Sequence, residues 1–237
     1  MFSKSPFHHF ESSDDRFYSR IREALRLASP LPGTDQHNTI ISSADLEGSF
    51  HHWLPPAPDS EETALSMLSS RLSDLKAELY RCAGLVSLVN GLRELAIQES
   101  WSRVALHKGY WMESCAEVFQ EALWADEPYK TSDLEQCDVA ITHCDAIVAQ
   151  TGSVLISSKT TNSRILTIVP PTHIVLTTVQ QIVWDLPAAF DLITQKYNPH
   201  YPSMITFITG PSRTADIERT LVLGAHGPRR LIIIIID

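Results

Sequence analysis

The C-terminal stretch from residue 204 to residue 236 constrains the fold of this chain more than any other part. Two apolar runs, Met204–Thr209 and Leu231–Ile236, flank a polar segment, Gly210–Pro228. The second run is far too short to span a membrane and is typical of a strand that is buried on both faces. Strand, loop, short helix, loop and strand within about 30 residues is the layout of a βαβ crossover. We therefore expect both runs to lie in one parallel sheet.

Upstream, from residue 60, helical and strand patterns alternate. Leucines recur at helical spacing from Leu65 to Leu75, behind a cap at Asp59 or Ser60. This alternation predicts an α/β layered domain with helices on both faces of the sheet. We expect further helices at Leu85–Ile97, at Ser114–Leu123 and from Pro187 toward Gln195 with Asp185 as cap; strands at Ala77–Cys82, Ser102–His107, Val139–Thr142, Ser153–Ser157, Ile165–Val169 and Ile174–Thr178; and a polar turn at Ser158–Arg164.

Residues 1–59 differ from the rest of the chain in composition. Ser, His, Pro and Asp are frequent there, and one helical patch, Phe17–Leu27, stands out. We predict an N-terminal extension with one short helix, followed by a domain at 60–237. Aromatic residues scattered through the extension suggest that it docks onto the domain or onto a partner: Phe7, Phe10, Phe17, Phe50 and Trp53.

Composition argues against several functional classes for this chain. The net charge is -9 and no long basic run occurs, which argues against a nucleic-acid surface. No apolar run approaches the roughly 18 residues of a membrane span, and the start lacks the apolar core of a signal peptide. The four cysteines form no CxxC pair, and His8-His9 and His51-His52 have no partners at metal-site spacing. We expect a cytoplasmic protein with free thiols and no metal of its own.

The loop after the first C-terminal run is the first candidate site. Ser212 or Thr214 is placed to cap the expected helix. Backbone N–H groups at a helix start attract anions, and Arg213 adds a planar cation that suits a carboxylate or phosphate. Asp216 in the first turn already satisfies the helix dipole. A capped helix with a structural Arg–carboxylate pair is therefore an equally supported alternative.

Three other places carry polar groups next to predicted strands. Gln150, Thr151 and Gly152 form a small turn with Ser153, although ordinary hairpins have the same composition. His226 lies in the loop that enters the last strand, where a structural role is favoured over an acid–base role. His173 begins a strand and either faces a cleft or is a hydrogen-bonded core histidine.

Four segments together resemble the LUD-domain family: GPSRTADIE at 210–218, GAHGP at 224–228, PPTHI at 170–174 and the turn at 150–153. The resemblance covers roughly residues 60–237. It implies a fold similar to that of the NagB, ribose-5-phosphate isomerase and CoA-transferase superfamily. It also implies a role in bacterial oxidation of L-lactate to pyruvate, beside proteins that carry iron–sulfur clusters. The clusters are then expected on those partners, and no cofactor on this chain.

One position departs from the family pattern. Members often have Glu before the Thr-Gly of the turn, whereas this chain has Gln150. An amide cannot replace the glutamate that CoA transferases use as a covalent nucleophile, so that chemistry is not expected here. Two hypotheses remain: an accessory, non-catalytic subunit of an L-lactate-oxidising iron–sulfur complex, or an independent enzyme or binding module for a small anionic ligand at Arg213. A homo-oligomer stays open in both.

Overall fold

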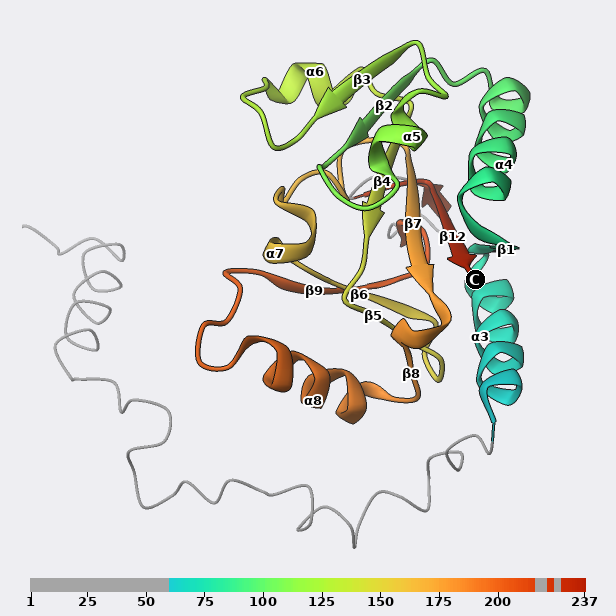
Figure 1. Ribbon diagram of the computed structural model, residues 1–237, viewed down its shortest axis with the longest axis vertical. Coiled ribbons are helices and arrows are strands. Elements are labelled where there is room, and N and C mark those ends of the chain that lie inside the picture. The colour runs from blue at the N-terminus through green and yellow to red at the C-terminus, as the bar shows by residue number, and fades with distance from the viewer. Residues whose placement is uncertain (1–59, 216–220, 224–226) are drawn as a thin grey trace, which may run out of the picture. The chain divides into compact units, whose positions relative to one another are not determined.

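A six-stranded sheet, parallel at every pairing, lies at the centre of the computed structural model, which describes residues 60–215, 221–223 and 227–237 (Figure 1). In spatial order its strands are β1 (Glu78–Cys82), β12 (Arg230–Ile236), β7 (Thr172–Thr178), β4 (Val139–His143), β2 (Arg103–Leu106) and β3 (Glu121–Trp124). The alternation in the sequence thus correctly predicted a mixed α/β fold. The predicted extension at 1–59 lies outside the described residues and stays a prediction.

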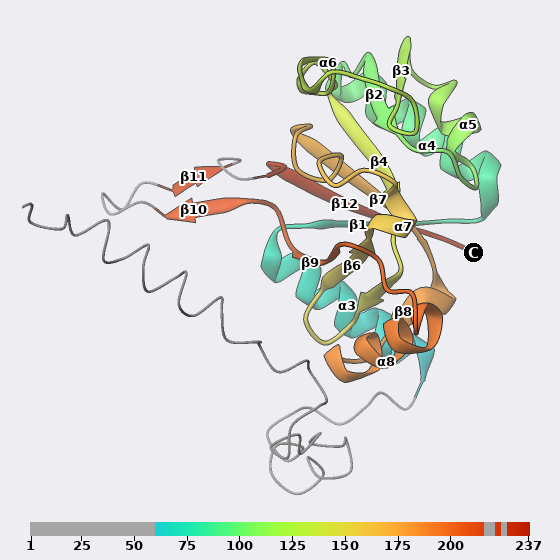
Figure 2. The ribbon, with the colours of Figure 1, turned by 90° about the vertical axis from the view of Figure 1, so that its left-hand side faces the viewer.

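A second, smaller sheet is inserted between the strands of the first. The chain leaves the main sheet after β4, and leaves it again after β7, to build this four-stranded sheet. Its strands in spatial order are β8 (Ile182–Val183), β5 (Ala146–Val148), β6 (Ser153–Ser157) and β9 (Ile205–Thr209). A separate antiparallel pair, β10 (Arg213–Ala215) and β11 (Leu221–Leu223), follows β9 (Figure 2).

Two of the described helices, α3 (Glu61–Leu75) and α8 (Leu186–Tyr197), begin at residues whose side chains cap them. Ser60 Oγ accepts a hydrogen bond from the Thr63 N–H at the start of α3, and Asp185 accepts one from the Ala188 N–H at the start of α8. Both caps were predicted, the first as one of two alternatives. The described helices are α3 (Glu61–Leu75), α4 (Gly84–Glu99), α5 (Met112–Ala116), α6 (Thr131–Glu135), α7 (Ser158–Thr161) and α8 (Leu186–Tyr197), with a 3₁₀ turn at Val179–Gln181.

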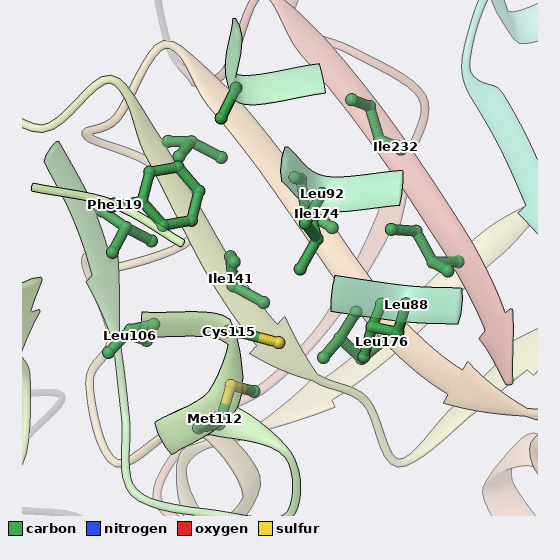
Figure 3. Packing of buried hydrophobic residues seen from close by; sticks show 14 of the residues in the cluster. Leu88, Leu92, Leu106, Met112, Cys115, Phe119, Ile141, Ile174, Leu176 and Ile232 are labelled. Carbon is green, nitrogen blue, oxygen red and sulfur yellow. The ribbon is translucent and has the colours of Figure 1, made fainter. Parts of the chain in front are cut away.

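One face of the main sheet packs against α4 and α5. Leu88 and Leu92 of α4 lie over Ile174 and Leu176 of β7 and Ile232 of β12, and all five are almost fully buried (Figure 3). Burying a side chain of this size contributes roughly 1.5–3 kcal/mol. This face therefore holds a large share of the hydrophobic stabilisation.

The opposite face carries α3 and the smaller sheet. Leu68 and Leu72 of α3 are buried against Ile233 and Ile235 of β12, together with apolar residues of β5 and β6. The outer face of the smaller sheet is covered by α8, through Ala189, Ile193 and Tyr197. Strand β12 is consequently buried on both faces, as its continuous apolar run predicted.

Three local predictions were wrong. Ile165–Val169 forms turns rather than a strand, and its Leu166 fills the space over Ala105 and Ala140. The segment expected as a helix at 114–123 ends early, because its last residues pair with β2 as the edge strand β3. The polar turn expected at 158–164 begins with the short helix α7.

The predicted βαβ unit was also wrong. Strands β9 and β12 belong to different sheets, and Arg213–Ala215, expected to begin a helix, is strand β10. The Ser212 N–H donates to the Pro228 carbonyl over 2.8 Å, so the outgoing and returning chains are tied together in extended form. This long-range pairing overrides the local capping pattern.

Replacing Gly152 by alanine should destabilise the domain. Gly152 has a φ of +68°, and an added Cβ would lie 2.9 Å from Leu75 Cδ1 and 3.2 Å from Arg71 Cβ. We expect Gly152→Ala to lower the free energy of unfolding by about 1–3 kcal/mol in urea titrations. Gly91→Ala is the matched control, since nothing lies within 4 Å of a Cβ added at Gly91 in α4. This substitution should raise the free energy of unfolding by about 0.5–1 kcal/mol. A neutral Gly152→Ala would contradict this packing.

Candidate functional site

A pocket of about 510 Å³ lies along β9 and the chain that follows it. Its walls come from the segment 164–168 before β7, from 204–213, and from Gly227 and Pro228 before β12. Because the lining residues precede β7 and β12, the pocket lies toward the amino ends of these parallel strands. We call it the arginine pocket; its polar lining residues are Arg164, Thr167, Thr206, Thr209, Ser212 and Arg213.

Two guanidinium groups give the arginine pocket its electrostatic character. Arg213 Nη2 donates to the Leu75 carbonyl over 3.0 Å, and Arg164 Nη2 donates to Ser203 Oγ over 2.8 Å. Neither arginine forms an ion pair with a carboxylate of the described residues, and the described residues that line the pocket include no Asp or Glu. A guanidinium has five N–H donors, so each retains several for a carboxylate or phosphate.

The end of helix α3 positions Arg213. Leu75 is the last residue of α3, and its carbonyl has no partner within the helix. Gly210, with a φ of +78°, passes so close that an added Cβ would lie 3.2 Å from Leu75 Cβ. The chain leaving β9 is thereby pressed against α3, and Arg213 caps the helix from there. The arginine thus has the structural role that the sequence left open, with a carbonyl as its partner instead of a carboxylate.

A chain of hydroxyl groups links the turn at Gln150 to the same pocket. Thr151 Oγ1 lies 2.7 Å from Ser153 Oγ, which lies 2.7 Å from Thr209 Oγ1 in the pocket wall. Gly152 packs against Leu75, the residue that also meets Arg213. The structure therefore brings the turn at Gln150 and the loop at Arg213 to neighbouring positions, although only the loop lines the pocket.

Gln150 itself points elsewhere. Its N–H donates to the Trp184 carbonyl over 3.0 Å, as the chain turns from β5 toward β6. Its side-chain Nε2 is buried and has no hydrogen-bond partner. An unpaired buried amide costs roughly 1–3 kcal/mol, so this position carries a stability cost.

His173 is a core residue. It is fully buried on β7, and its Nε2 lies 2.8 Å from Thr142 Oγ1 on β4. Burial lowers the pKa of His173 to about 3, so the ring is neutral near pH 7. Of the two interpretations that the sequence left open, the core histidine agrees with this burial.

The structure describes two of the four remaining candidate residues. Thr214 belongs to β10, where its backbone pairs with Val222, and Ser212 lines the arginine pocket. Asp216 and His226 lie outside the described residues. Sequence reasoning missed Arg164, Thr167, Thr206 and Thr209. A signal for Thr209 was available, since it is the last polar residue of a predicted strand before Gly210; Arg164 stood in a segment interpreted only as a turn.

Among the described residues, no group of three or more His, Cys, Asp or Glu side chains could hold a metal ion. Within the same ranges, no helix has the length and apolar character to cross a bilayer. Cys115, Cys137 and Cys144 are buried, and burial raises their pKa values to about 12, 11 and 12. These thiols pack the core in protonated form.

The depressed pKa of His173 should make the domain sensitive to acid. An unfolded histidine binds a proton below about pH 6.5, whereas the folded ring resists protonation down to about pH 3. Stability from this group is therefore complete above pH 6.5 and falls by about 1.4 kcal/mol for each pH unit below it. In urea titrations, the free energy of unfolding of the parent should fall between pH 6.5 and 5. In His173→Gln that fall should be smaller by about 2 kcal/mol.

His200→Gln, at an exposed histidine, is the control for that comparison. It should keep the parent's dependence on pH. If His173→Gln retained the full dependence as well, the buried neutral state of His173 would be refuted.

Residues 104–236 match the model of the LUD domain family. Over 102 residues the chain is 36% identical to a protein named Lactate utilization protein C from Anoxybacillus flavithermus, covering 43% of this chain and 45% of that one. Over 105 residues it is 36% identical to a Bacillus subtilis protein of the same name, with 44% of each chain covered. The matches thus span less than half the length of these relatives.

The fold has a solved counterpart. A crystal structure of a DUF162 family protein from Deinococcus radiodurans superposes with a TM-score of 0.60 at 22% identity, covering 76% of this chain and 100% of that chain. This likeness concerns the fold. Since the LUD model matches more than half of the residues, the chain belongs to the LUD-domain family.

Proposed function

We propose that this protein works in a lactate-utilization system and that the arginine pocket binds a small carboxylate. The observation that carries the proposal is the presence of Arg164 and Arg213 in one pocket, where none of the described lining residues is acidic. The relatives named Lactate utilization protein C support the choice of ligand, since lactate is a small carboxylate. A carboxylate between the two guanidinium groups would form charge-assisted hydrogen bonds.

The chemistry of the pocket favours binding over turnover. Its described lining holds hydroxyl groups and guanidinium groups, with no His, Lys, Cys, Asp or Glu side chain. A hydroxyl is a weak nucleophile unless a base activates it. The threonine and serine hydroxyls fit a ligand hydroxyl or keto oxygen, as in a 2-hydroxy or 2-keto acid.

We further propose that the chain is an accessory subunit beside iron–sulfur proteins. The family resemblance supports this assignment, as does the packing of Cys115, Cys137 and Cys144 inside the core. Raised pKa values disfavour the thiolate form that cluster ligation requires. The clusters are therefore assigned to partner proteins.

The fold proposed for the domain is a variant of the NagB, ribose-5-phosphate isomerase and CoA-transferase type. The parallel sheet flanked by helices supports this proposal. CoA-transferase chemistry is not part of it, because Gln150 stands where a covalent nucleophile would be needed and its amide is buried. A shared fold does not by itself transfer an activity.

Carboxylate binding should be visible as thermal or chemical stabilisation. Lactate or pyruvate at 100 times its dissociation constant should add about 2.7 kcal/mol to the free energy of unfolding. Arg164→Ala and Arg213→Ala should each weaken binding at least tenfold by calorimetry, since each removes a charge-assisted contact. Arg164→Ala is the cleaner test, because Arg213 also caps α3.

The matched control is Arg93→Ala, on α4 and outside the arginine pocket. It should bind the carboxylates as the parent does. Absence of heat and of stabilisation with lactate, pyruvate and phosphate alike would refute the anion site.

The accessory role should be visible in the proteins that co-purify. Tagged full-length chain, isolated from its own host grown on lactate, should bring down iron-containing proteins together with lactate dehydrogenase activity. An iron-free eluate containing only this chain would contradict the accessory role, and would leave the carboxylate site to be judged by its own assay.

A further inference from the structure

The order in which the chain adds strands to the main sheet reverses between β2 and β4, although all the strands are parallel. These strands are neighbours, but the chain continues from β2 to β3 on one side and from β4 to β7 on the other. In open parallel sheets, such a switch point leaves a crevice at the carboxyl ends of the two strands, where ligands bind. The arginine pocket lies toward the opposite, amino ends, so this edge is a separate place in the fold.

Two histidines stand at the carboxyl ends of these strands. His107 directly follows β2, and His143 is the last residue of β4. Their rings meet edge to face with centroids 5.2 Å apart. Neither residue belongs to the hydrophobic clusters, and the sequence motifs did not single them out.

The hydrogen bonds of His107 are fully used. Its Nδ1 lies 3.0 Å from the Lys108 carbonyl, which can only accept, so Nδ1 carries the proton. Its Nε2 then accepts the backbone N–H of His143 over 3.3 Å. Burial lowers the pKa of His107, in agreement with a neutral ring. His107 is therefore a positioning residue that fixes the end of β4.

His143 keeps one nitrogen free. Its Nε2 lies 2.9 Å from the Tyr110 carbonyl and must donate to it, which leaves Nδ1 with a lone pair. Nδ1 has no hydrogen-bond partner among the described residues and is not a buried atom. Burial of the ring and the neighbouring His107 lower the pKa of His143 to about 4. At neutral pH this nitrogen is an acceptor.

Gly109 lies close to His143 Nδ1, and only a residue without a side chain fits there. A Cβ at Gly109 would lie 3.1 Å from His143 Nδ1 and 2.9 Å from its Cε1. Any other residue would place its side chain against the free lone pair. The lack of a side chain at Gly109 therefore leaves Nδ1 uncovered on this side.

The surroundings indicate the class of ligand. Tyr110 is 79% exposed, and its ring meets the Trp111 ring edge to face at 5.6 Å, with Trp111 6.1 Å from the His143 ring. Exposed aromatic rings suit stacking by a flat ring. Asp126 accepts hydrogen bonds from the Lys108 N–H and from Asn162 Nδ2, and Lys108 Nζ pairs with Glu127. Lys108 offsets the charge of Glu127, whereas Asp126 has no ion pair among the described residues, so Asp126 disfavours an anion.

We propose that the carboxyl edge at His107 and His143 is a second binding site, which takes a neutral flat-ring ligand with N–H or O–H donors, of nucleoside type. His143 Nδ1 accepts a hydrogen bond from the ligand, Tyr110 stacks on the ligand ring, and Gly109 places no side chain over Nδ1. The site does not depend on the carboxylate proposal, since no residue is shared with the arginine pocket.

The test is a titration of the full-length chain, labelled with ¹⁵N in its histidines, with adenosine, guanosine, cytidine and uridine. The Nδ1 signal of His143 should begin as a bare nitrogen and shift saturably with at least one nucleoside. Gly109→Ala and His143→Asn should each weaken that binding at least tenfold while keeping the parent's circular dichroism. Arg164→Ala should bind the nucleoside unchanged, which separates this site from the arginine pocket.

Two outcomes would overturn the proposal as a whole, and a third would overturn its ligand class. One is an unmoved His143 signal with all four nucleosides at millimolar concentration. The other is equal nucleoside binding by the parent and by both Gly109→Ala and His143→Asn. A His143 signal that responds to Zn²⁺ but to no nucleoside would also overturn the ligand class, because it would make Nδ1 a metal-binding nitrogen.

Discussion

The pairing of β12 between β1 and β7 is the constraint on which the rest of the domain depends. β12 is the last strand of the chain, β1 is the first described strand, and both pairings are parallel. Its six aliphatic residues alternate between the two cores, with Ile232, Ile234 and Ile236 facing α4 and the other three facing α3. Strand β7 also serves both cores, but its aliphatic run has only the three residues Ile174, Val175 and Leu176. Loss of this pairing would open both cores together.

The same pairing explains why the arginine pocket combines distant residues. Parallel strands bring the segments that precede them to one edge, so Leu75 before β1, Thr167 before β7 and Pro228 before β12 lie together. The Arg229 N–H bonds to the Pro171 carbonyl and the Ser212 N–H to the Pro228 carbonyl, which joins these segments directly. Arg213 then reaches the end of α3. The pocket is a consequence of sheet order more than of any single motif.

The elements that sequence reasoning predicted correctly are those with strong periodicity. The leucines of α3, the amphipathic α4 and the apolar β12 carry their own signal, because burial on one face or on both decides the pattern. The β9–β12 unit was wrong for a physical reason. An apolar run indicates that a strand is buried, but it does not indicate to which sheet the strand belongs. In the structure β9 pairs with β6, whereas β12 pairs with β7.

The candidate site was predicted only in part, because tertiary contacts that the sequence does not reveal bring its residues together. Arg213 and Ser212 were singled out through a helix start that does not exist, since the chain there is extended and tied to Pro228. Their place in a pocket follows from tertiary contacts. Arg164 could not be identified, because nothing in a polar turn indicates that it will face a strand 40 residues later. His107 and His143 became visible only through strand order, which places their two strand ends side by side.

The two edges of the sheet differ in the charge they favour. At the amino edge, Arg164 and Arg213 attract anions, whereas at the carboxyl edge the Asp126 carboxylate repels them and His143 stays neutral. Between the edges lies the buried hydrogen bond from His173 on β7 to Thr142 on β4, the residue before His143. A close-packed sheet of this kind transmits displacement only if whole strands shift. The strands also hold these edges apart at a fixed separation, so ligands at the two places should bind with little mutual influence, each selected by the charge of its own edge.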